Sequence, residues 1–179
     1  MPVPCHAALD VGCGEGQLSA KMATRSKRVT AIDISPRMVA LARESVHADN
    51  VTFIEGDVID HPFAAESFDF IAAIAVLHHV PFGDSLRRMA GLLRRGGVLA
   101  VVGLARNGSP ADYAVSAISV PVALIFRMRR GMRDSLAPRL DPDMAYAEIK
   151  DVARAVLPGV EVKRRLFFRH TLLWRKPGG

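Results

Sequence analysis

Three closely spaced glycines near the start of the chain are the first residues whose spacing indicates chemistry. The stretch ALDVGCGEGQLS, residues 8–19, places Gly12, Gly14 and Gly16 at every second position shortly after Asp10. Glycine lets the backbone adopt positive φ and lets a ligand approach with no Cβ in the way. A glycine loop between a buried strand and a helix therefore predicts a binding edge, because open α/β sheets bind ligands at the carboxyl ends of their strands.

The spacing of these glycines argues against two common nucleotide-binding loops. The dinucleotide fingerprint is G-x-G-x-x-G, and here the third glycine comes one residue early. The Gly-Lys-Ser/Thr ending of a phosphate-binding loop is absent. Glu15 lies inside the loop, where its carboxylate would repel a pyrophosphate but tolerate a cationic ligand. A dinucleotide-dependent oxidoreductase is therefore the least favoured of the functions considered.

The elements that must position this loop alternate along the first part of the chain. Short apolar runs predict strands at residues 7–11, 28–33, 51–57, 68–76 and 98–104. Helical patterns lie between some of them, at residues 17–25, 36–46 and 84–93. Ser35 is a natural N-cap, Pro36 fits a first helical turn, and Gly96-Gly97 is expected to stop the third helix. Near-continuous apolar strands separated by helices are typical of a parallel sheet covered on both faces, so we predict a doubly wound α/β fold.

The rest of the chain predicts an insertion, a helix and a hairpin. Within residues 105–140 the uncharged run 113–126 precedes a basic cluster of Arg127, Arg129, Arg130 and Arg133. Asp141 is expected to cap a helix that ends near Leu157. Residues 160–168 and 169–176 predict an antiparallel hairpin. We expect one domain over residues 1–179, with 105–140 as an inserted segment on the substrate side.

Composition and charge narrow the classes of partner. The 179-residue chain carries a net charge of +6, which suits anionic partners, but aromatic residues make up only 6%, too few to favour base stacking on nucleic acid. Two cysteines, Cys5 and Cys13, form no disulfide framework, and the scattered histidines show no metal-ligand spacing. Neither a signal peptide nor a membrane-spanning apolar run is recognisable, so we expect a cytoplasmic protein.

Several motifs in order resemble the class I S-adenosylmethionine-dependent methyltransferases, in their small-molecule, type 11-like branch. LDVGCGEG is similar to the first motif of that family, and AIDIS and EGDV are similar to the acidic ends of its second and third strands. FDFIAAIAVLHHV, LLRRGGVLAV and LPGVEVKRRLFFRHTLLWRKP resemble its fourth strand, fifth strand and terminal hairpin. The resemblance covers residues 7–104 and 142–177. It implies a Rossmann-like, mostly parallel sheet of seven strands in the order 3-2-1-4-5-7-6, with an antiparallel last strand and helices on both faces.

The resemblance implies S-adenosyl-L-methionine as the cofactor and assigns its methionine part to the glycine loop. Gly12, Gly14 and Gly16 would wrap that part, and Cys13 would be a small filler between them. Asp10 would orient the loop and the ammonium group of the cofactor.

The adenosine part of the cofactor would lie along the ends of the second and third strands. Asp33 would accept hydrogen bonds from both ribose hydroxyls, because a carboxylate has the paired acceptor sites to do so. Ile34 would pack on the adenine. Asp57 would accept from the adenine amino group, and Val58 would offer its backbone N–H to the ring.

Residues at and beyond the end of the fourth strand would lie near the transferred methyl group. Ala73 or Ile74 would line the methionine side through backbone carbonyl groups. His78 or His79 is a candidate general base, because an unperturbed histidine titrates near neutral pH; pocket lining is the alternative role. The implied reaction is an in-line displacement, in which a substrate nucleophile attacks the sulfonium-bound methyl and S-adenosylhomocysteine leaves.

Absent motifs favour a small-molecule acceptor that is methylated at oxygen or carbon. Neither the Asn/Asp-Pro-Pro-Tyr/Phe signature of amino-methylating DNA enzymes nor the Pro-Cys nucleophile of cytosine-methylating ones is present. The run 113–126 could cover a pocket for an apolar substrate or, with the arginines after it, contact anionic lipid weakly. Packing of this run in the core, with the arginines in solvent, is the alternative that we favour.

Two further alternatives stay open, and the oligomeric state is not predicted. Enzymes of the resembled kind usually carry a longer segment ahead of the loop that helps to close the site. A cofactor-binding subunit with weak or no catalysis therefore remains possible. The positive charge keeps an RNA or protein methyltransferase open as well.

Overall fold

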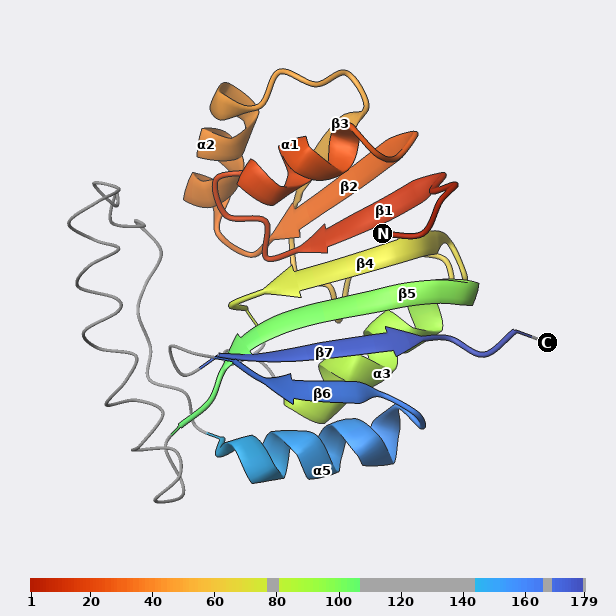
Figure 1. Ribbon diagram of the computed structural model, residues 1–179. Coiled ribbons are helices and arrows are strands. Elements are labelled where there is room, and N and C mark those ends of the chain that lie inside the picture. The colour runs from red at the N-terminus through yellow and green to blue at the C-terminus, as the bar shows by residue number, and fades with distance from the viewer. Residues whose placement is uncertain (77–80, 107–143, 166–168, 179) are drawn as a thin grey trace.

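Seven strands form a single sheet in the computed structural model, which describes residues 1–76, 81–106, 144–165 and 169–178. The strand order is β3-β2-β1-β4-β5-β7-β6 (Figure 1), as the resemblance implied. The strands are β1 (Ala7–Val11), β2 (Arg28–Asp33), β3 (Val51–Glu55), β4 (Phe68–Ile74), β5 (Leu93–Leu104), β6 (Glu161–Arg164) and β7 (Arg169–Arg175). Neighbouring strands in the part β3-β2-β1-β4-β5 are parallel, and β7 runs antiparallel to both of its neighbours, β5 and β6.

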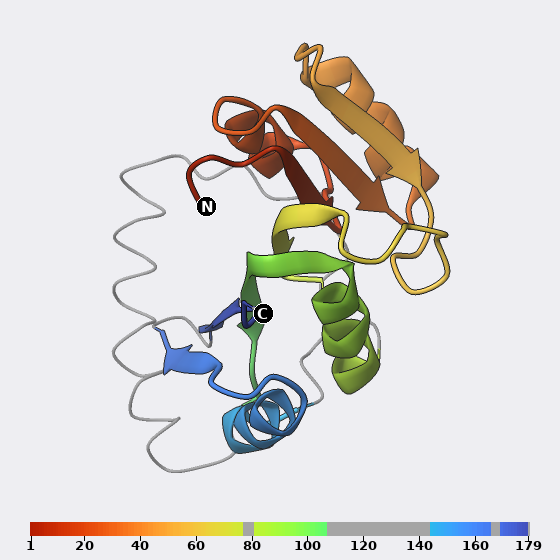
Figure 2. The ribbon, with the colours of Figure 1, turned by 90° about the vertical axis from the view of Figure 1, so that its right-hand side faces the viewer.

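Four helices among the described residues cover parts of both sheet faces. They are α1 (Gln17–Ala23), α2 (Pro36–Ser45), α3 (Phe82–Leu92) and α5 (Tyr146–Val156). The hydroxyl of Ser35 accepts from the backbone N–H of Met38 at 3.4 Å, so the predicted cap of α2 is confirmed. α3 and α5 pack over the larger apolar cluster, whereas α1 packs over a smaller one on the other face (Figure 2). No helix in the described ranges is long and apolar enough to span a bilayer.

The two strands beside the predicted site end earlier than the apolar runs indicated. β3 ends at Glu55 rather than at residue 57, because Gly56 turns the chain with φ +156. β4 ends at Ile74 rather than at residue 76, because Ala75 adopts φ +56, which a strand does not accommodate. Both turns place the following residues at the carboxyl edge of the sheet.

The prediction that Gly96-Gly97 stops the third helix is wrong. α3 ends at Leu92, and β5 starts at Leu93 and runs through both glycines. The pairing of β5 with β4 shifts register between Phe68 and Phe70, and a Cβ on Gly97 would lie 2.8 Å from the carbonyl oxygen of Arg94. Gly97 therefore lets an irregular strand pass close to its own backbone, which a sequence pattern does not distinguish from a helix stop.

The prediction that the last helix starts at Asp141 is also wrong, and Asp141 itself lies outside the described residues. α5 starts at Tyr146, and the carboxylate of Glu148 accepts from the backbone N–H of Ala145 at 2.7 Å. The backbone N–H of Arg106 donates to the carbonyl of Met144 at 2.9 Å and holds the approach to the helix extended. The predicted insertion 105–140 lies almost wholly in residues 107–143, which are outside the described residues. The last predicted strand residues before the hairpin turn, 166–168, are also outside them.

Asp69 fixes the chain where it enters β1. One of its carboxylate oxygens accepts from the backbone N–H groups of His6 and Ala7, each at 2.8 Å. The other accepts from the guanidinium of Arg94 at 2.9 Å. Burial alone would raise the pKa of Asp69, but these hydrogen bonds lower it below its ordinary value. β1 is thus anchored at its amino end, opposite to the glycine loop.

His170 is a buried polar side chain on β7. It is 2% exposed, and neither ring nitrogen has a hydrogen-bond partner in the described part of the chain. A Cβ on Gly103 of β5 would overlap the imidazole ring, so glycine is needed beneath it. Arg164, its cross-strand neighbour on β6, stacks its guanidinium over the Tyr146 ring at 5.4 Å. Burial lowers the pKa of His170 to about 4.

We predict that His170 makes the protein less stable in acid. Its folded pKa lies below its unfolded value of about 6.5, so unfolding takes up a proton between these values and stability falls as pH decreases from 7 to 4. The loss is on the order of 3 kcal/mol. His170→Gln should flatten the dependence of the unfolding free energy on pH, measured by urea denaturation at several pH values. His47→Gln, at an exposed histidine, is the matched control, and equal profiles for all three proteins would contradict the prediction.

Candidate cofactor site

The glycine loop follows β1 and is clamped to the neighbouring strand β2. Gly12, Gly14 and Gly16 adopt φ of +66, +52 and +78, the left-handed region that favours glycine. The backbone N–H groups of Gly12 and Cys13 donate to the carbonyl of Ile32, at 2.8 and 3.2 Å. The N–H of Gly16 donates to the carbonyl of Cys13 at 2.9 Å and closes the turn that leads into α1. Hydrogen bonds within the chain therefore fix the shape of the loop.

Asp33 joins this loop to the start of α2. Its Oδ2 accepts from the backbone N–H of Gly14 at 2.8 Å, and its Oδ1 accepts from the N–H of Ser35 at 2.9 Å. Its carbonyl accepts from the N–H of Gly56, at the end of β3, at 3.0 Å. Each carboxylate oxygen still has an acceptor site for a further donor. Asp33 is thus held rigidly, half-buried, and able to accept hydrogen bonds from the paired hydroxyls of a ribose.

The space around each glycine shows which one leaves room for a ligand. A Cβ on Gly12 would overlap Val76, and one on Gly16 would lie 2.9 Å from Cγ2 of Val46 and 3.1 Å from Cζ of Phe53. A Cβ on Gly14 would meet no atom of the described residues within 4 Å. Gly12 and Gly16 therefore serve close packing, whereas Gly14 presents bare backbone to open space, as binding of the expected cofactor requires.

Asp10 stabilises the loop from beneath. It is buried, and its Oδ2 accepts from the hydroxyl of Ser19 on α1 at 2.6 Å. Burial raises the pKa of Asp10 to about 6; the hydrogen bond from Ser19 opposes this shift, and the charge of Asp33 adds to it. The sequence analysis missed Ser19. A buried carboxylate nine residues before a helical serine is the signal that could have found it, since a buried carboxylate needs a donor.

Cys13 is buried inside the loop as an uncharged thiol. Burial, followed by the nearby charges of Asp10 and Asp33, raises its pKa to about 12. A thiol in this state is neither a nucleophile nor a metal ligand at neutral pH. Its predicted role as a small filler beside the cofactor stays a prediction.

Two apolar side chains are exposed at the carboxyl edge, one on each side of the loop. Ile34, next to Asp33, is 71% exposed, and Ile74, at the end of β4, is 45% exposed. Ala73 is fully buried and packs in the main core. Of these two residues, Ile74 therefore exposes its side chain at the edge, whereas the predicted contact of Ala73 or Ile74 through a backbone carbonyl stays a prediction.

Asp57 and Val58 form the turn after β3. Oδ1 of Asp57 accepts from the backbone N–H of Ile59 at 2.9 Å, and its carbonyl accepts from the N–H of His61 at 2.9 Å. Val58 is buried, and its carbonyl accepts from Nε of Arg88 at 3.2 Å. The hydrogen bond between Gly56 and Asp33 brings this turn beside the ribose position. The adenine contacts of Asp57 and Val58 remain predictions.

The structure thus brings most of the predicted site residues to one edge, where β1, β2, β3 and β4 end (Figure 1). His78 and His79 lie outside the described residues, so their predicted role stays a prediction. The contact of Asp10 with the cofactor's ammonium group also stays a prediction.

Comparison with known proteins connects this edge to a family. Residues 9–101 match the model of the methyltransferase domain family. An uncharacterized methyltransferase of Mycobacterium tuberculosis is 30% identical over 182 residues, which cover 99% of this chain and 90% of that protein. The ubiquinone biosynthesis O-methyltransferase of Xanthomonas campestris is 37% identical over 123 residues, which cover 65% of this chain and 49% of that enzyme.

The solved structures show the same fold. A SAM-dependent methyltransferase from Aquifex aeolicus superposes with a TM-score of 0.65 over 95% of this chain and 81% of its own, at 16% identity. That likeness concerns the fold alone, but the family match spans the glycine loop, Asp33 and the Asp57 turn together. The chain belongs to the methyltransferase domain family and is an S-adenosylmethionine-dependent methyltransferase.

Proposed function

We propose that this enzyme transfers the methyl group of S-adenosyl-L-methionine to an oxygen or carbon atom of a small, partly apolar organic acceptor. The observation that carries the proposal is the edge itself, where a clamped carboxylate and open glycine backbone lie between two exposed isoleucines, Ile34 and Ile74. The name of the Xanthomonas relative, which refers to ubiquinone biosynthesis, supports a small organic acceptor.

Residues of this chain would hold the cofactor from three sides. The cofactor supplies a methyl group already activated on a sulfonium, so the protein's contribution is orientation and exclusion of water. Asp33 would accept from the ribose hydroxyls, the Gly14 backbone would lie against the methionine part, and Ile34 would cover the adenine. Because the Asp33 carboxylate is fixed by two backbone N–H groups, little rearrangement is needed on binding.

The acceptor would enter from the β4 side of the loop. Ile74 exposes its apolar side chain on that side. The backbone N–H of Ala75, the next residue, donates to the carbonyl of Val102 at 2.7 Å. Up to residue 75, the end of β4 therefore offers the acceptor apolar contact through Ile74. An acceptor with an apolar body and a single reactive oxygen or carbon suits such a surface.

We predict that Asp33→Ala weakens binding of S-adenosylhomocysteine at least tenfold in titration calorimetry. Hydrogen bonds to a charged group contribute about 1.5–3 kcal/mol each, and the variant removes both ribose acceptors. Asp49→Ala, at an exposed aspartate away from the edge, should bind like the wild type. Thermal unfolding of both variants separates loss of the site from loss of the fold. An unchanged dissociation constant for a folded Asp33→Ala protein would remove the ribose assignment.

The acceptor class is tested by the release of S-adenosylhomocysteine. We expect release, followed by mass spectrometry, when the enzyme and cofactor are incubated with a small-molecule cell extract, and none with purified total RNA or with dialysed protein. The Asp33→Ala variant should reduce that release. Release with RNA or protein alone would overturn the proposed acceptor, and binding without any release would favour a cofactor-binding subunit.

A further inference from the structure

The outer strands of the sheet present a second surface that the reaction does not use. Side chains of β7 alternate: His170, Leu172 and Trp174 are buried on the side of α3 and α5. The other side carries Arg169, Thr171, Leu173 and Arg175, opposite Glu161 and Lys163 of β6. Arg165 belongs to this side too, since its Nε donates to Oγ1 of Thr171 at 3.3 Å. We call this surface the hairpin face; its residues are Lys163, Arg165, Arg169, Thr171, Leu173 and Arg175.

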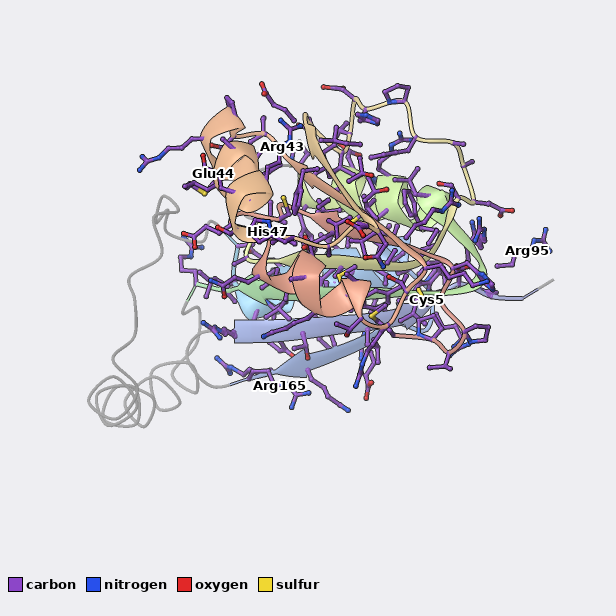
Figure 3. The ribbon with its side chains drawn as sticks, turned by 90° about the horizontal axis from the view of Figure 1, so that it is seen from above. Cys5, Arg43, Glu44, His47, Arg95 and Arg165 are labelled. Atoms are coloured by element: carbon purple, nitrogen blue, oxygen red, sulfur yellow. The ribbon has the colours of Figure 1, made fainter. Side chains whose placement is uncertain are left out.

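No helix among the described residues packs on the hairpin face. α3 and α5 lie on the opposite side of the sheet, and α1 and α2 pack mainly on β1, β2 and β3. Figure 1 shows β4, β5, β7 and β6 turned toward the viewer, with α3 behind them. Seen from above, the hairpin forms one margin of the molecule, and Arg165 lies there (Figure 3). Within the part of the chain that the structure describes, the side chains of this face are therefore exposed or half-buried.

The centre of the hairpin face is apolar. Leu173 is 49% exposed and lies opposite Ala100 of β5. Val98 and Val102, on the same side of β5, are half-buried and continue the apolar strip toward Ile74. An exposed leucine joined to such a strip indicates contact with an apolar partner rather than an isolated surface residue.

The rim of the hairpin face is positively charged. Among the described residues, no carboxylate lies within ion-pair distance of Arg165, Arg169 or Arg175, and Lys163 is paired with Glu161. Nη1 of Arg175 donates to the carbonyl of Gly96 at 3.3 Å, which leaves the guanidinium charge uncompensated. Within the described ranges, three arginines without a carboxylate partner thus lie on the same face as the exposed Leu173, whose cross-strand neighbour on β6 is Glu161.

We propose that the hairpin face docks on an anionic membrane surface. Leu173 would enter the boundary between headgroups and acyl chains, and the arginines would bind lipid phosphates, which their planar donors match in pairs. Long arginine side chains keep their charge at the headgroups while their stems cover apolar surface. A second copy of the chain fits less well, because a two-fold contact would bring these cations together. Nucleic acid fits less well because, among the described residues of the hairpin face, none is an aromatic side chain on which a base could stack.

The test is vesicle flotation of the full chain with two lipid compositions. We expect the wild type to float with phosphatidylcholine vesicles that contain phosphatidylglycerol and not with phosphatidylcholine alone. Arg169→Glu combined with Arg175→Glu should lower the partition coefficient at least about tenfold. Leu173→Gln should lower it several-fold with every charge retained. Rising salt should weaken binding of the wild type, because exposed charges are screened.

A matched control separates the face from net charge. Arg25→Glu combined with Lys27→Glu changes the net charge equally at exposed positions between α1 and β2. It should float like the wild type, and all variants should still bind S-adenosylhomocysteine, which keeps this test independent of the proposed acceptor. Failure of the wild type to float with anionic vesicles, or an equal loss in the control, would overturn the proposal. Binding of polyuridylate in place of vesicles would overturn it in favour of nucleic acid.

Discussion

The carboxylate of Asp33 is the interaction on which the candidate site depends. One of its oxygens holds the backbone of Gly14, and the other holds the start of α2 through Ser35. Without this clamp, the three glycines would have many conformations available, since glycine restricts the backbone least. With it, one glycine faces open space while its two neighbours are packed against Val76 and Val46. Folding thus already restricts the conformations of the loop, so that less conformational entropy of the loop is lost when a ligand binds.

Much of this arrangement could be predicted from the sequence because the signals are local and periodic. Apolar runs found β1 and β2 at their observed bounds, and Ser35 followed by Pro36 found the start of α2. The glycine spacing, with Asp33 at the end of the next strand, predicted the loop and the carboxylate beside it. The sheet order came from the resemblance to a family rather than from any pattern in the chain, and the structure confirms it.

The errors arose where long-range contacts override local signals. Gly96-Gly97 is a good helix stop in sequence, but backbone hydrogen bonds with Lys176, just after β7, hold both glycines in an extended strand. Ala145, which no sequence rule favours as a cap, precedes α5 because a backbone bond from Arg106 fixes its entry. The bond between Asp10 and Ser19 and the buried ring of His170 were hidden for the same reason, since burial of a polar group depends on what packs over it. Each of these is a property of the assembled sheet.

The central claim is that the carboxyl edge is built for a cationic adenosyl cofactor and not for a dinucleotide. Titration calorimetry of the unaltered protein with S-adenosylhomocysteine and, separately, with NADH tests it most directly. The clamped Asp33 and the early third glycine predict saturable one-to-one binding of S-adenosylhomocysteine and no measurable heat with NADH. Saturable binding of NADH, with none of S-adenosylhomocysteine, would contradict the account.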